Sequence, residues 1–444
     1  MNAVIDDYIQ RLGHPDIEAR HQAAEAFAKM GKSAVPFLLE VLGSPNRLAR
    51  RSAIKALVNI GGDSAKYPVI QALMQECEGA YSVVASILGS PEKIIADYWL
   101  STGVKYALLQ ALPDGYRKRW LGVVSVEKYC EELSKKAGVS EALQEGAQKV
   151  WEEGGTLLRG SRAPENANEL LRPAYNIPTT DPQMLLRATV QGEPLPDGSR
   201  AVQPTMPPSA GKYPLNPEDE AKMCYISGGL YKLGKTGESD NPPHDVALFG
   251  FHISKNLVTV GQYEAYCKAK GESLPTAPNF NRDWSKKDHP IVKVTWAEAR
   301  TYAKWAGGDL PTEAEWEVAS RGGLEGKEYP WGDTWDALKC ANATNGIGGT
   351  MAIGSYPANG YGLHDMAGNA WEWCLDAYDA SYWKGTQLLE PLNLPDSNSA
   401  ERVLRGGSWN YLTPDNFRCA GRTRNAPGAG DYDRGFRVVF RGLR

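Results

Sequence analysis

The stretch from Gly362 to Cys374, GLHDMAGNAWEWC, constrains the fold of this 444-residue chain more than any other. It joins a His364-Asp365 pair and a Gly368-Asn369 turn signal to Trp371-Glu372-Trp373, and no helical or strand period runs through it. Glycine permits backbone conformations that are closed to other residues, and tryptophan can cover the result with a large apolar ring. The stretch therefore predicts an irregular, tightly folded loop region.

Two later motifs belong with this stretch, namely Arg405-Gly406-Gly407-Ser408-Trp409 and Gly435-Phe436-Arg437-Val438. Together the three motifs resemble the formylglycine-generating-enzyme (sulfatase-modifying-factor) family, whose fold is a variant of the C-type lectin fold. The resemblance runs from about Met223 to the C-terminus, half of the chain. It implies an α+β domain of C-type lectin type over residues 221–444.

Charge and hydropathy exclude several classes of function. The chain has 49 Lys plus Arg against 53 Asp plus Glu, and no block of like charge stands out, so no nucleic-acid or membrane partner is expected. No apolar run approaches the roughly 20 residues that a bilayer span needs, and the N-terminus lacks a basic region. The expected location is cytoplasmic. The seven cysteines form no CxxC pair and are expected to be reduced core thiols.

The N-terminal part repeats itself with a period of thirty residues. His14-Pro15-Asp16, Arg20, Ala23, Ala26 and Gly31 recur as Ser44-Pro45-Asn46, Arg50, Ala53, Ala56 and Gly61. Each unit reads as a turn and two helices ending at glycine, which is typical of a HEAT-like α-solenoid that docks a protein partner. One unit cannot bury its own apolar face, so at least three are expected, the third beginning within Ala65–Glu78. A plain helical bundle is the alternative.

The composition divides the chain into three parts. Residues 1–153 are predicted to form the HEAT-like helical domain, and residues 221–444 the lectin-like domain. Between them, residues 154–220 are rich in proline and glycine, and Gln191 to Pro217 alone holds seven prolines. This segment is predicted to be a linker or an extended strap.

Short patterns predict the elements of the second domain. Alternating apolar residues bounded by glycine predict strands within 225–234 and 246–254. Thr259 is expected to cap a helix that runs to Ala269, and Thr295 a helix over Ala297–Ala306. Thr312 and Glu315 have the spacing of a capping box.

The resemblance implies two structural calcium sites. Asp365, Gly368, Ala370 and Glu372 fall at positions that hold one calcium ion in the resembled enzymes, and Asn342, Ala343, Asn345 and Ile347 match a second. Asn345 stands where the family often has aspartate, so the second site should be weaker. The alternative is that Asp365 and Glu372 only accept hydrogen bonds from neighbouring backbone amides.

The sequence argues against the oxidase chemistry of the family. The resembled oxidase holds copper with two cysteines that closely follow its Gly-Gly-Ser motif, but no cysteine stands between Ser408 and Arg418. Sulfoxide synthase-like relatives use iron held by a histidine-rich helical domain. The N-terminal half offers only His14 and His21, at repeat positions expected to face solvent. We therefore expect no catalytic residue and no redox cofactor.

The last forty residues instead resemble the variable region of a diversity-generating retroelement protein. Its fixed frame of Arg-Gly-Gly-Ser-Trp, Pro-Asp-Asn, alternating arginines and a closing Gly-Phe-Arg is present. The predicted ligand contacts are Tyr411, Leu412, Thr413, Asp415, Asn416, Gly421, Thr423, Asn425, Ala426, Asp431, Tyr432 and Asp433. Short polar side chains with tyrosine anchors on a rigid frame are typical of a protein-binding or other macromolecule-binding surface. A metal-dependent oxidase, a sugar-binding lectin and ordinary surface loops remain alternatives.

Overall fold

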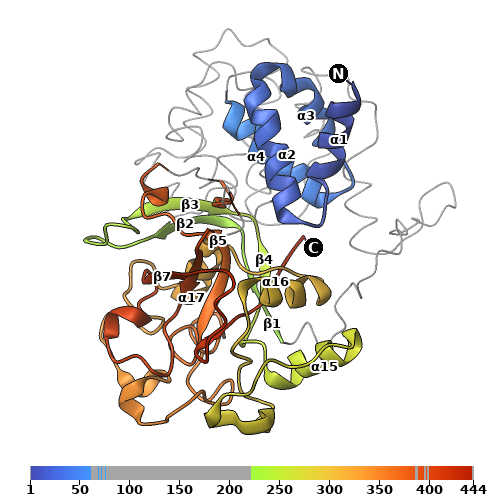
Figure 1. The fold of residues 1–444 in the computed structure, drawn as a ribbon. Helices are drawn as coiled ribbons and strands as arrows, with labels where there is room; N and C mark the ends of the chain where they lie inside the picture. Colours follow the sequence, from blue (N-terminus) through green and yellow to red (C-terminus); the bar gives the residue numbers. More distant parts are fainter. Residues whose placement is uncertain are drawn as a thin grey trace, which may run out of the picture. The chain divides into compact units, whose positions relative to one another are not determined.

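The fold is described for two stretches of the chain, and Figure 1 shows it as a ribbon. The structure, a computed structural model, describes residues 2–61, 69, 72, 76, 222–385, 389–394, 397 and 400–442. The described residues on both sides of the long gap belong to one compact unit. Most of the predicted third repeat unit, the later helices and the linker over 154–220 lie outside the described residues, so these predictions stay predictions.

Four helices make up the described N-terminal part (Figure 1). They are α1 (Asn2–Leu12), α2 (Ile17–Met30), α3 (Val35–Val41) and α4 (Arg47–Ile60), with the 3-10 turn η1 (Gly31–Ala34) before α3. α2 packs against α1 and α4, and α3 packs against α4. Leu12, Phe27, Leu38 and Ile54 are buried between them, so the helices share one apolar core.

The thirty-residue repeat is confirmed in the way its helices begin and end. The side chains of Asp16 and Asn46 accept backbone N–H groups in the first turns of α2 and α4, as N-caps do. Gly31 and Gly61 end the two helices at φ of 65° and 67°, a region that disfavours side chains. The two described units therefore have the same local design. A solenoid of three or more units stays a prediction.

The repeated arginines also have the same role in both units. Arg20 Nη1 donates to the carbonyls of His14-Pro15, both at 2.7 Å, and Arg50 Nη1 donates to those of Ser44-Pro45, at 2.8 and 3.1 Å. Each arginine thus fixes the turn before its own helix. The expectation that His21 faces solvent was wrong, because its side chain is only 7% exposed.

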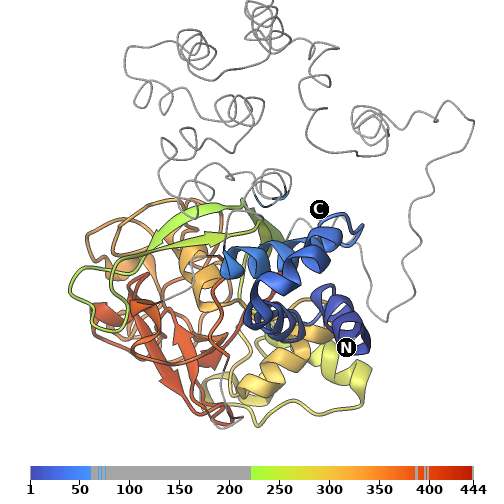
Figure 2. The same cartoon turned by 90° about the horizontal axis from the view of Figure 1, so that it is seen from above.

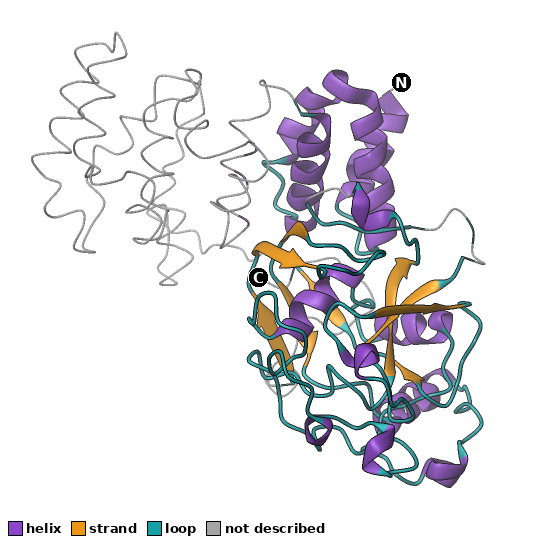
Figure 3. Cartoon of the chain, turned by 90° about the vertical axis from the view of Figure 1, so that its left-hand side faces the viewer, coloured by secondary structure: helices purple, strands orange, loops and turns teal. Residues whose placement is uncertain are grey.

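The described residues of the C-terminal domain form three small sheets. Long loop segments join them (Figure 3). The strands are β1 (Met223–Ile226), β2 (Gly229–Leu233), β3 (His244–Leu248), β4 (Phe251–Ser254), β5 (Trp371–Ala377), β6 (Arg402–Arg405), β7 (Arg422–Asn425), β8 (Arg434–Gly435) and β9 (Val439–Arg441). The sheet orders are β1-β4-β9, β2-β3 and β7-β6-β5-β8. The strands predicted within 225–234 and 246–254 are confirmed as parts of β1 to β4.

The four-stranded sheet gathers separate loops at one of its ends. Glu372, Arg405, Arg422 and Gly435 stand in one row across it. β5, β7 and β8 run in one direction and β6 in the other. The chain that enters β5, β7 and β8 and the chain that leaves β6 therefore meet at this end, which we call the loop end.

One expectation for the Gly362–Cys374 stretch was wrong. Trp371–Ala377 is not part of an irregular loop but forms β5, and all seven of its residues are buried. A strand that is covered on both faces has no reason to alternate apolar and polar residues. The absence of a period was therefore a sign of burial. The part before it, Gly362–Ala370, does lack helix and strand.

The three predicted helix caps are confirmed. The helices are α15 (Val260–Lys270), α16 (Trp296–Trp305) and α17 (Glu313–Arg321). Thr259, Thr295 and Thr312 each accept an N–H from the residue three positions on, and that residue's side chain accepts the N–H of the threonine. These are complete capping boxes. No described helix is long and apolar enough to span a lipid bilayer.

Helices α2 and α4 contact the C-terminal domain directly, and Figure 2 shows the helices beside it. Arg51 Nη1 on α4 donates to the carbonyl of Gly250 at 3.1 Å, and Lys55 Nζ donates to that of Glu390 at 2.7 Å. On the domain side, Arg300 of α16 pairs with Glu18 at 2.6 Å. Polar contacts therefore hold the helices to the domain at several places.

Candidate ligand-binding surface

An aromatic patch lies among the loops around the loop end of the sheet. We use this name for Phe280, Trp409, Tyr411, Leu412 and Tyr432. Tyr411, Leu412 and Tyr432 are 36%, 63% and 44% exposed, and they are three of the seven large apolar side chains exposed among the described residues. Exposed apolar groups that gather in one place are typical of interaction sites. This patch is therefore the strongest candidate for a binding surface.

Ring contacts connect three members of the patch to one another and a fourth to the buried core. Trp409 packs edge-on against Phe280, with ring centres 5.2 Å apart, and lies 5.9 Å from the ring of Tyr432. Tyr411 packs edge-on against the buried Trp371 at 5.4 Å. Phe280 was missed by the sequence analysis, because it lies 129 residues before Trp409 (409 − 280) and no local pattern connects them.

Backbone hydrogen bonds fix the patch from below. The N–H of Trp409 donates to the carbonyl of Asn369 at 3.2 Å, and the N–H of Ala343 donates to that of Tyr411 at 2.9 Å. The N–H of Trp371 donates to the carbonyl of Asp433 at 2.8 Å. These bonds join four segments that are far apart in the sequence, so the exposed rings stand on a rigid base.

Two glycines allow the sharp path of the chain into the patch. Gly406 and Gly407 have φ of 94° and 77°, which other residues rarely adopt. A Cβ on Gly407 would lie 2.7 Å from the ring of Phe417 and 2.9 Å from the carbonyl of Asn416. The Gly-Gly pair is thus required by both conformation and space.

Buried ion pairs hold the sheet beneath the patch. We call Glu313, Glu317, Arg321, Arg405 and Arg422 the ionic frame. Arg422 binds Glu313 through two nitrogens at 2.7 and 2.8 Å, and Glu317 receives Arg405 and Arg321. Burial alone would raise the pKa of Glu317, but the two arginines lower it to about 2. Its carboxylate is therefore charged over the whole ordinary pH range.

A second buried pair joins β5 to the closing Gly-Phe-Arg motif. Arg437 donates to both carboxylate oxygens of Glu372, at 2.6 and 2.7 Å, and Trp316 Nε1 donates to Glu372 Oε2 at 2.9 Å. Glu372 and Arg437 are fully buried. Two-nitrogen arginine–carboxylate bonds are both strong and directional. Two of the three sequence motifs, Gly362–Cys374 and Gly435–Val438, are thereby connected through side chains.

The predicted contact residues differ in their exposure. Exposed residues are Tyr411, Leu412, Thr413, Asp415, Ala426 and Tyr432, and partly buried ones are Asn416, Gly421, Thr423, Asn425 and Asp431. The prediction that Asp433 lies on the exposed surface was wrong. Its side chain is only 5% exposed and accepts a hydrogen bond from Ser408 Oγ at 3.4 Å. Burial raises the pKa of Asp433. Its side chain supports the loop from inside and does not face a ligand.

The structure brings only some of these residues together. The Tyr411–Thr413 segment, Gly421 and the Asp431–Tyr432 segment adjoin the loop end of the sheet. Thr423 and Asn425 instead lie on β7, an edge strand, and Asn425 is paired with Arg402 toward the other end of β6. The predicted set is therefore divided between the aromatic patch and the edge of the sheet.

The first predicted calcium site does not fit the ion as a complete set. Both carboxylate oxygens of Glu372 are bonded to Arg437, so they carry no free charge for a cation. Asp365 is buried, and its Oδ1 has no hydrogen-bond partner among the described residues, so it alone could serve as a ligand. The backbone at Gly368 and Ala370 could add only carbonyls. Calcium binding at this loop stays a prediction.

The second predicted calcium site uses its side chains within its own turn. Asn342 Oδ1 accepts the N–H of Thr344 at 3.0 Å, and Asn345 Oδ1 accepts the N–H of Asn342 at 2.9 Å. With Ala343 and Ile347, the predicted set contains no carboxylate, and calcium prefers charged oxygen ligands. These residues shape the turn that holds Tyr411, and they do not fit a calcium ion well.

The five described cysteines are all free, and four of them are buried. Cys224, Cys267, Cys340, Cys374 and Cys419 are free thiols, and burial raises the pKa of each, to about 12 for Cys340 and about 11 for Cys419. The thiolate is the form that binds metal. Within the described residues, no group of three or more His, Cys, Asp or Glu side chains is arranged to hold a metal ion.

Two known families match the two described parts of the chain. Residues 210–441, just over half of the chain, match the sulfatase-modifying factor enzyme 1-like domain. The chain belongs to this family. Residues 5–87 match HEAT repeats, in agreement with the thirty-residue repeat. Both parts of the predicted architecture are thereby supported.

Relatives of this family carry different names. The formylglycine-generating enzyme of Streptomyces coelicolor is 32% identical over 273 residues, which cover 48% of this chain and 86% of that protein. The serine/threonine-protein kinase pkn1 of Chlamydia caviae is 35% identical over 259 residues, which cover 52% of this chain and 41% of that protein. The match thus spans less than half the length of the chlamydial relative. Among solved structures, Treponema denticola variable protein 1 is 25% identical, with a TM-score of 0.43, and covers 50% of this chain and 95% of its own.

Proposed function

We propose that the C-terminal domain is a non-catalytic binding module that holds a protein or another macromolecule on the aromatic patch. The exposure of Tyr411, Leu412 and Tyr432 on a rigid, hydrogen-bonded base carries this proposal. Tyrosine combines a large apolar ring with a polar end and loses little conformational entropy on binding, so it is a frequent anchor of paratopes. The proposal extends the resemblance to a diversity-generating retroelement variable protein, whose ligand differs from copy to copy.

The binding test compares a double variant with a matched control. Immobilised protein would enrich ligands, and the dissociation constant of each identified ligand would then be measured directly. Tyr411→Ala with Tyr432→Ala should weaken binding roughly tenfold or more, because interface anchors contribute most of the affinity. Leu338→Ala removes a side chain that is 80% exposed but lies outside the patch, so its affinity should be unchanged. An unaltered dissociation constant in the double variant would rule out the patch.

The diversification part of the proposal has its own test at the level of DNA. The coding sequence from codon 400 to the stop codon, with a few kilobases downstream, should contain a near-identical repeat that differs at adenines, beside a reverse-transcriptase gene. Such a repeat would identify the variable positions one by one. If it is absent, the binding module loses this part of its support and rests on the patch alone.

The second candidate function is a metal-dependent oxidase. It is favoured by the family itself, since the formylglycine-generating enzyme of Streptomyces coelicolor matches over most of its length. A fold does not determine a reaction, however, and the Ser408–Arg418 segment lacks the cysteines that the resembled oxidase uses. Stoichiometric copper or iron in the purified protein, with oxygen uptake, would favour the enzyme. A sugar-binding lectin is a third option, and retained binding to a deglycosylated ligand would count against it.

A further inference from the structure

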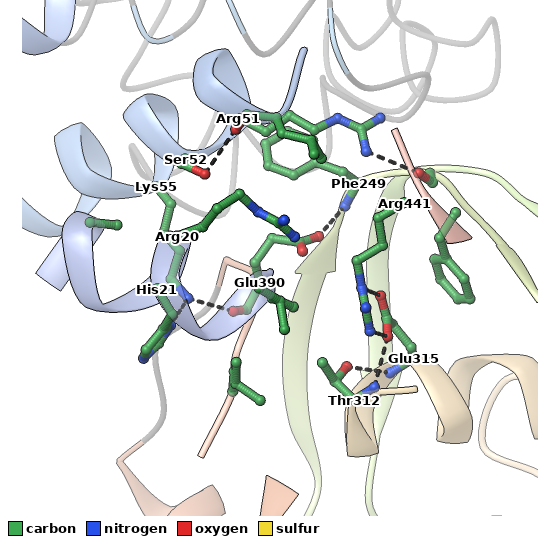
Figure 4. A pocket seen from close by; sticks show the side chains of 16 residues that line it. Arg20, His21, Arg51, Ser52, Lys55, Phe249, Thr312, Glu315, Glu390 and Arg441 are labelled. Atoms are coloured by element: carbon green, nitrogen blue, oxygen red, sulfur yellow. Dashed lines mark hydrogen bonds and ion pairs between the residues drawn. The ribbon is translucent and has the colours of Figure 1, made fainter. Parts of the chain in front are cut away.

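A basic pocket lies where α2 and α4 meet the C-terminal domain (Figure 4). We use this name for the cavity lined by Arg20, Arg51 and Lys55 from the helices and by Glu390 and Arg441 from the domain. Its volume is about 50 Å³. A cavity needs roughly 10–15 Å³, measured as the space open to the centre of a water molecule, to hold one water, so this space suits a few waters or one small ion.

The charges around the cavity are unbalanced. Arg441 is neutralised by Glu315, which receives its Nε at 2.6 Å and one Nη. Arg20, Arg51 and Lys55 remain, each at most 7% exposed, and Glu390 is the other carboxylate among the residues that line the pocket. Cations that are out of contact with water are costly unless a counter-charge is near.

The cations of the pocket are bonded mainly to neutral groups. Lys55 Nζ contacts His21 Nδ1 at 2.8 Å and donates to the backbone carbonyl of Glu390 at 2.7 Å. Arg20 donates to the two carbonyls before α2. Neither Arg20 nor Lys55 forms an ion pair within 4 Å with a carboxylate of the described residues. Within the described residues their positive charge is therefore offset only at longer range, chiefly by the Glu390 carboxylate.

Arg51 is only partly neutralised. Its Nη1 donates to the Gly250 carbonyl at 3.1 Å, and its Nε lies 3.5 Å from Glu76, a carboxylate that also pairs with Arg47 and Arg50. Within the part of the chain that the structure describes, one carboxylate shared by three arginines leaves an excess of positive charge.

The pKa values of Lys55 and Arg20 are both lowered in the folded protein. Burial lowers the pKa of Lys55 to about 8, and burial and then the charge of Arg441 lower that of Arg20 to about 10. Burial is the largest cause for both groups, and the Glu390 carboxylate offsets only part of it, so further negative charge would stabilise them. An anion in the cavity would supply it.

We propose that the basic pocket binds a tetrahedral oxyanion of phosphate size, with Arg20, Arg51 and Lys55 as its ligands. A guanidinium presents paired N–H groups that match phosphate oxygens, and an ammonium adds a point charge. Because the pocket is lined from both sides, a bound anion would also tie α2 and α4 to the domain. The anion is either free inorganic phosphate or the phosphate group of a larger molecule. This site is independent of the aromatic patch.

The test measures thermal stability of the full chain in inorganic phosphate, in sulfate and in chloride at matched ionic strength. Phosphate and sulfate should raise the melting temperature saturably, whereas chloride should not. Titration calorimetry with inorganic phosphate gives the dissociation constant. Methyl phosphate and phosphoserine are compared with inorganic phosphate, and tighter binding of either identifies the phosphate group of a larger molecule as the source. The pocket proposal is overturned if phosphate has no effect beyond that of ionic strength.

The repeat supplies a matched pair of variants. Arg20→Gln and Arg50→Gln each remove an arginine that fixes the turn before its helix, but only Arg20 lines the pocket. Arg20→Gln should raise the dissociation constant for phosphate at least tenfold. Arg50→Gln also removes one of the three arginines that share Glu76 with Arg51, so it should change the constant by less than about threefold. Lys55→Met should act like Arg20→Gln. An equal loss in both arginine variants would overturn the assignment, because it would reflect the fold and not the pocket.

Discussion

Between residues 405 and 432, two arginines of the ionic frame alternate with residues of the aromatic patch. The arginine side chains are buried, whereas Tyr411, Leu412 and Tyr432 are exposed. Arg405 has a side chain that is 0% exposed and paired with Glu317, whereas Leu412, only seven positions later (412 − 405), is 63% exposed. Arg422 is likewise bonded to Glu313, while Tyr432 faces outward. The residues that hold the fold are thus separate from those that can contact a ligand. Such a division would let contact residues change at small cost in stability.

The largest effect should follow from breaking the frame. Glu317→Gln removes the charge that receives Arg405 and Arg321. Arg321 would then remain buried without a counter-ion, and Arg405 would keep only the more distant Glu313, at 3.5 Å, which also pairs with Arg422. We expect the free energy of unfolding to fall by roughly 3–5 kcal/mol, as measured by urea denaturation. The control is Glu401→Gln, whose pair with Arg424 is about half exposed and should contribute less than about 1 kcal/mol. Equal losses in the two variants would abolish the distinction between frame and surface.

The effect of Glu317 should depend on pH in a defined direction. The folded-state pKa of Glu317 is about 2, below its ordinary value of 4.5. A lowered pKa contributes stability that is fully present above pH 4.5 and is lost as the pH falls toward 2. The difference in unfolding free energy between the wild type and Glu317→Gln should therefore shrink over this window. Other carboxylates titrate in both proteins and cancel in the difference, so a constant difference down to pH 2.5 would contradict the ion pair.

A smaller loss should follow from Gly407→Ala, which tests the turn that joins frame and patch. The positive φ and the contacts with Phe417 and Asn416 should together cost about 2 kcal/mol or more. Gly428→Ala is the matched control, since a Cβ there would meet no atom within 4 Å. It should be neutral or stabilising by about 0.4–1 kcal/mol. Thermal unfolding of both variants decides whether the Gly-Gly pair is structural.

The smallest effect on stability should come from the patch itself. Leu412→Ala removes an exposed side chain, so the free energy of unfolding should change by less than about 0.5 kcal/mol. Binding of the ligand should weaken in the same variant. A large loss of stability would show that the patch belongs to the core and would contradict its role as a contact surface.

Local rules explain why much of the fold could be predicted. Each cap at Thr259, Thr295 and Thr312 depends on two residues three positions apart, which the sequence displays directly. The repeat was equally visible, because its caps and its glycines recur at fixed positions. β5 was missed because a strand buried on both faces shows no alternation. For the candidate site, the sequence indicated the exposed tyrosines but not Phe280.

The sequence by itself determined the two-part architecture, the helix starts and ends, and the segment that carries Tyr411 and Tyr432, because these depend on composition and short-range spacing. Only the tertiary structure decided which charges meet. It paired Glu372 with Arg437 across 65 positions, buried Asp433, and gathered Arg20, Lys55 and Glu390 around one cavity. Such contacts depend on how distant segments pack, and packing leaves no periodic trace in the chain.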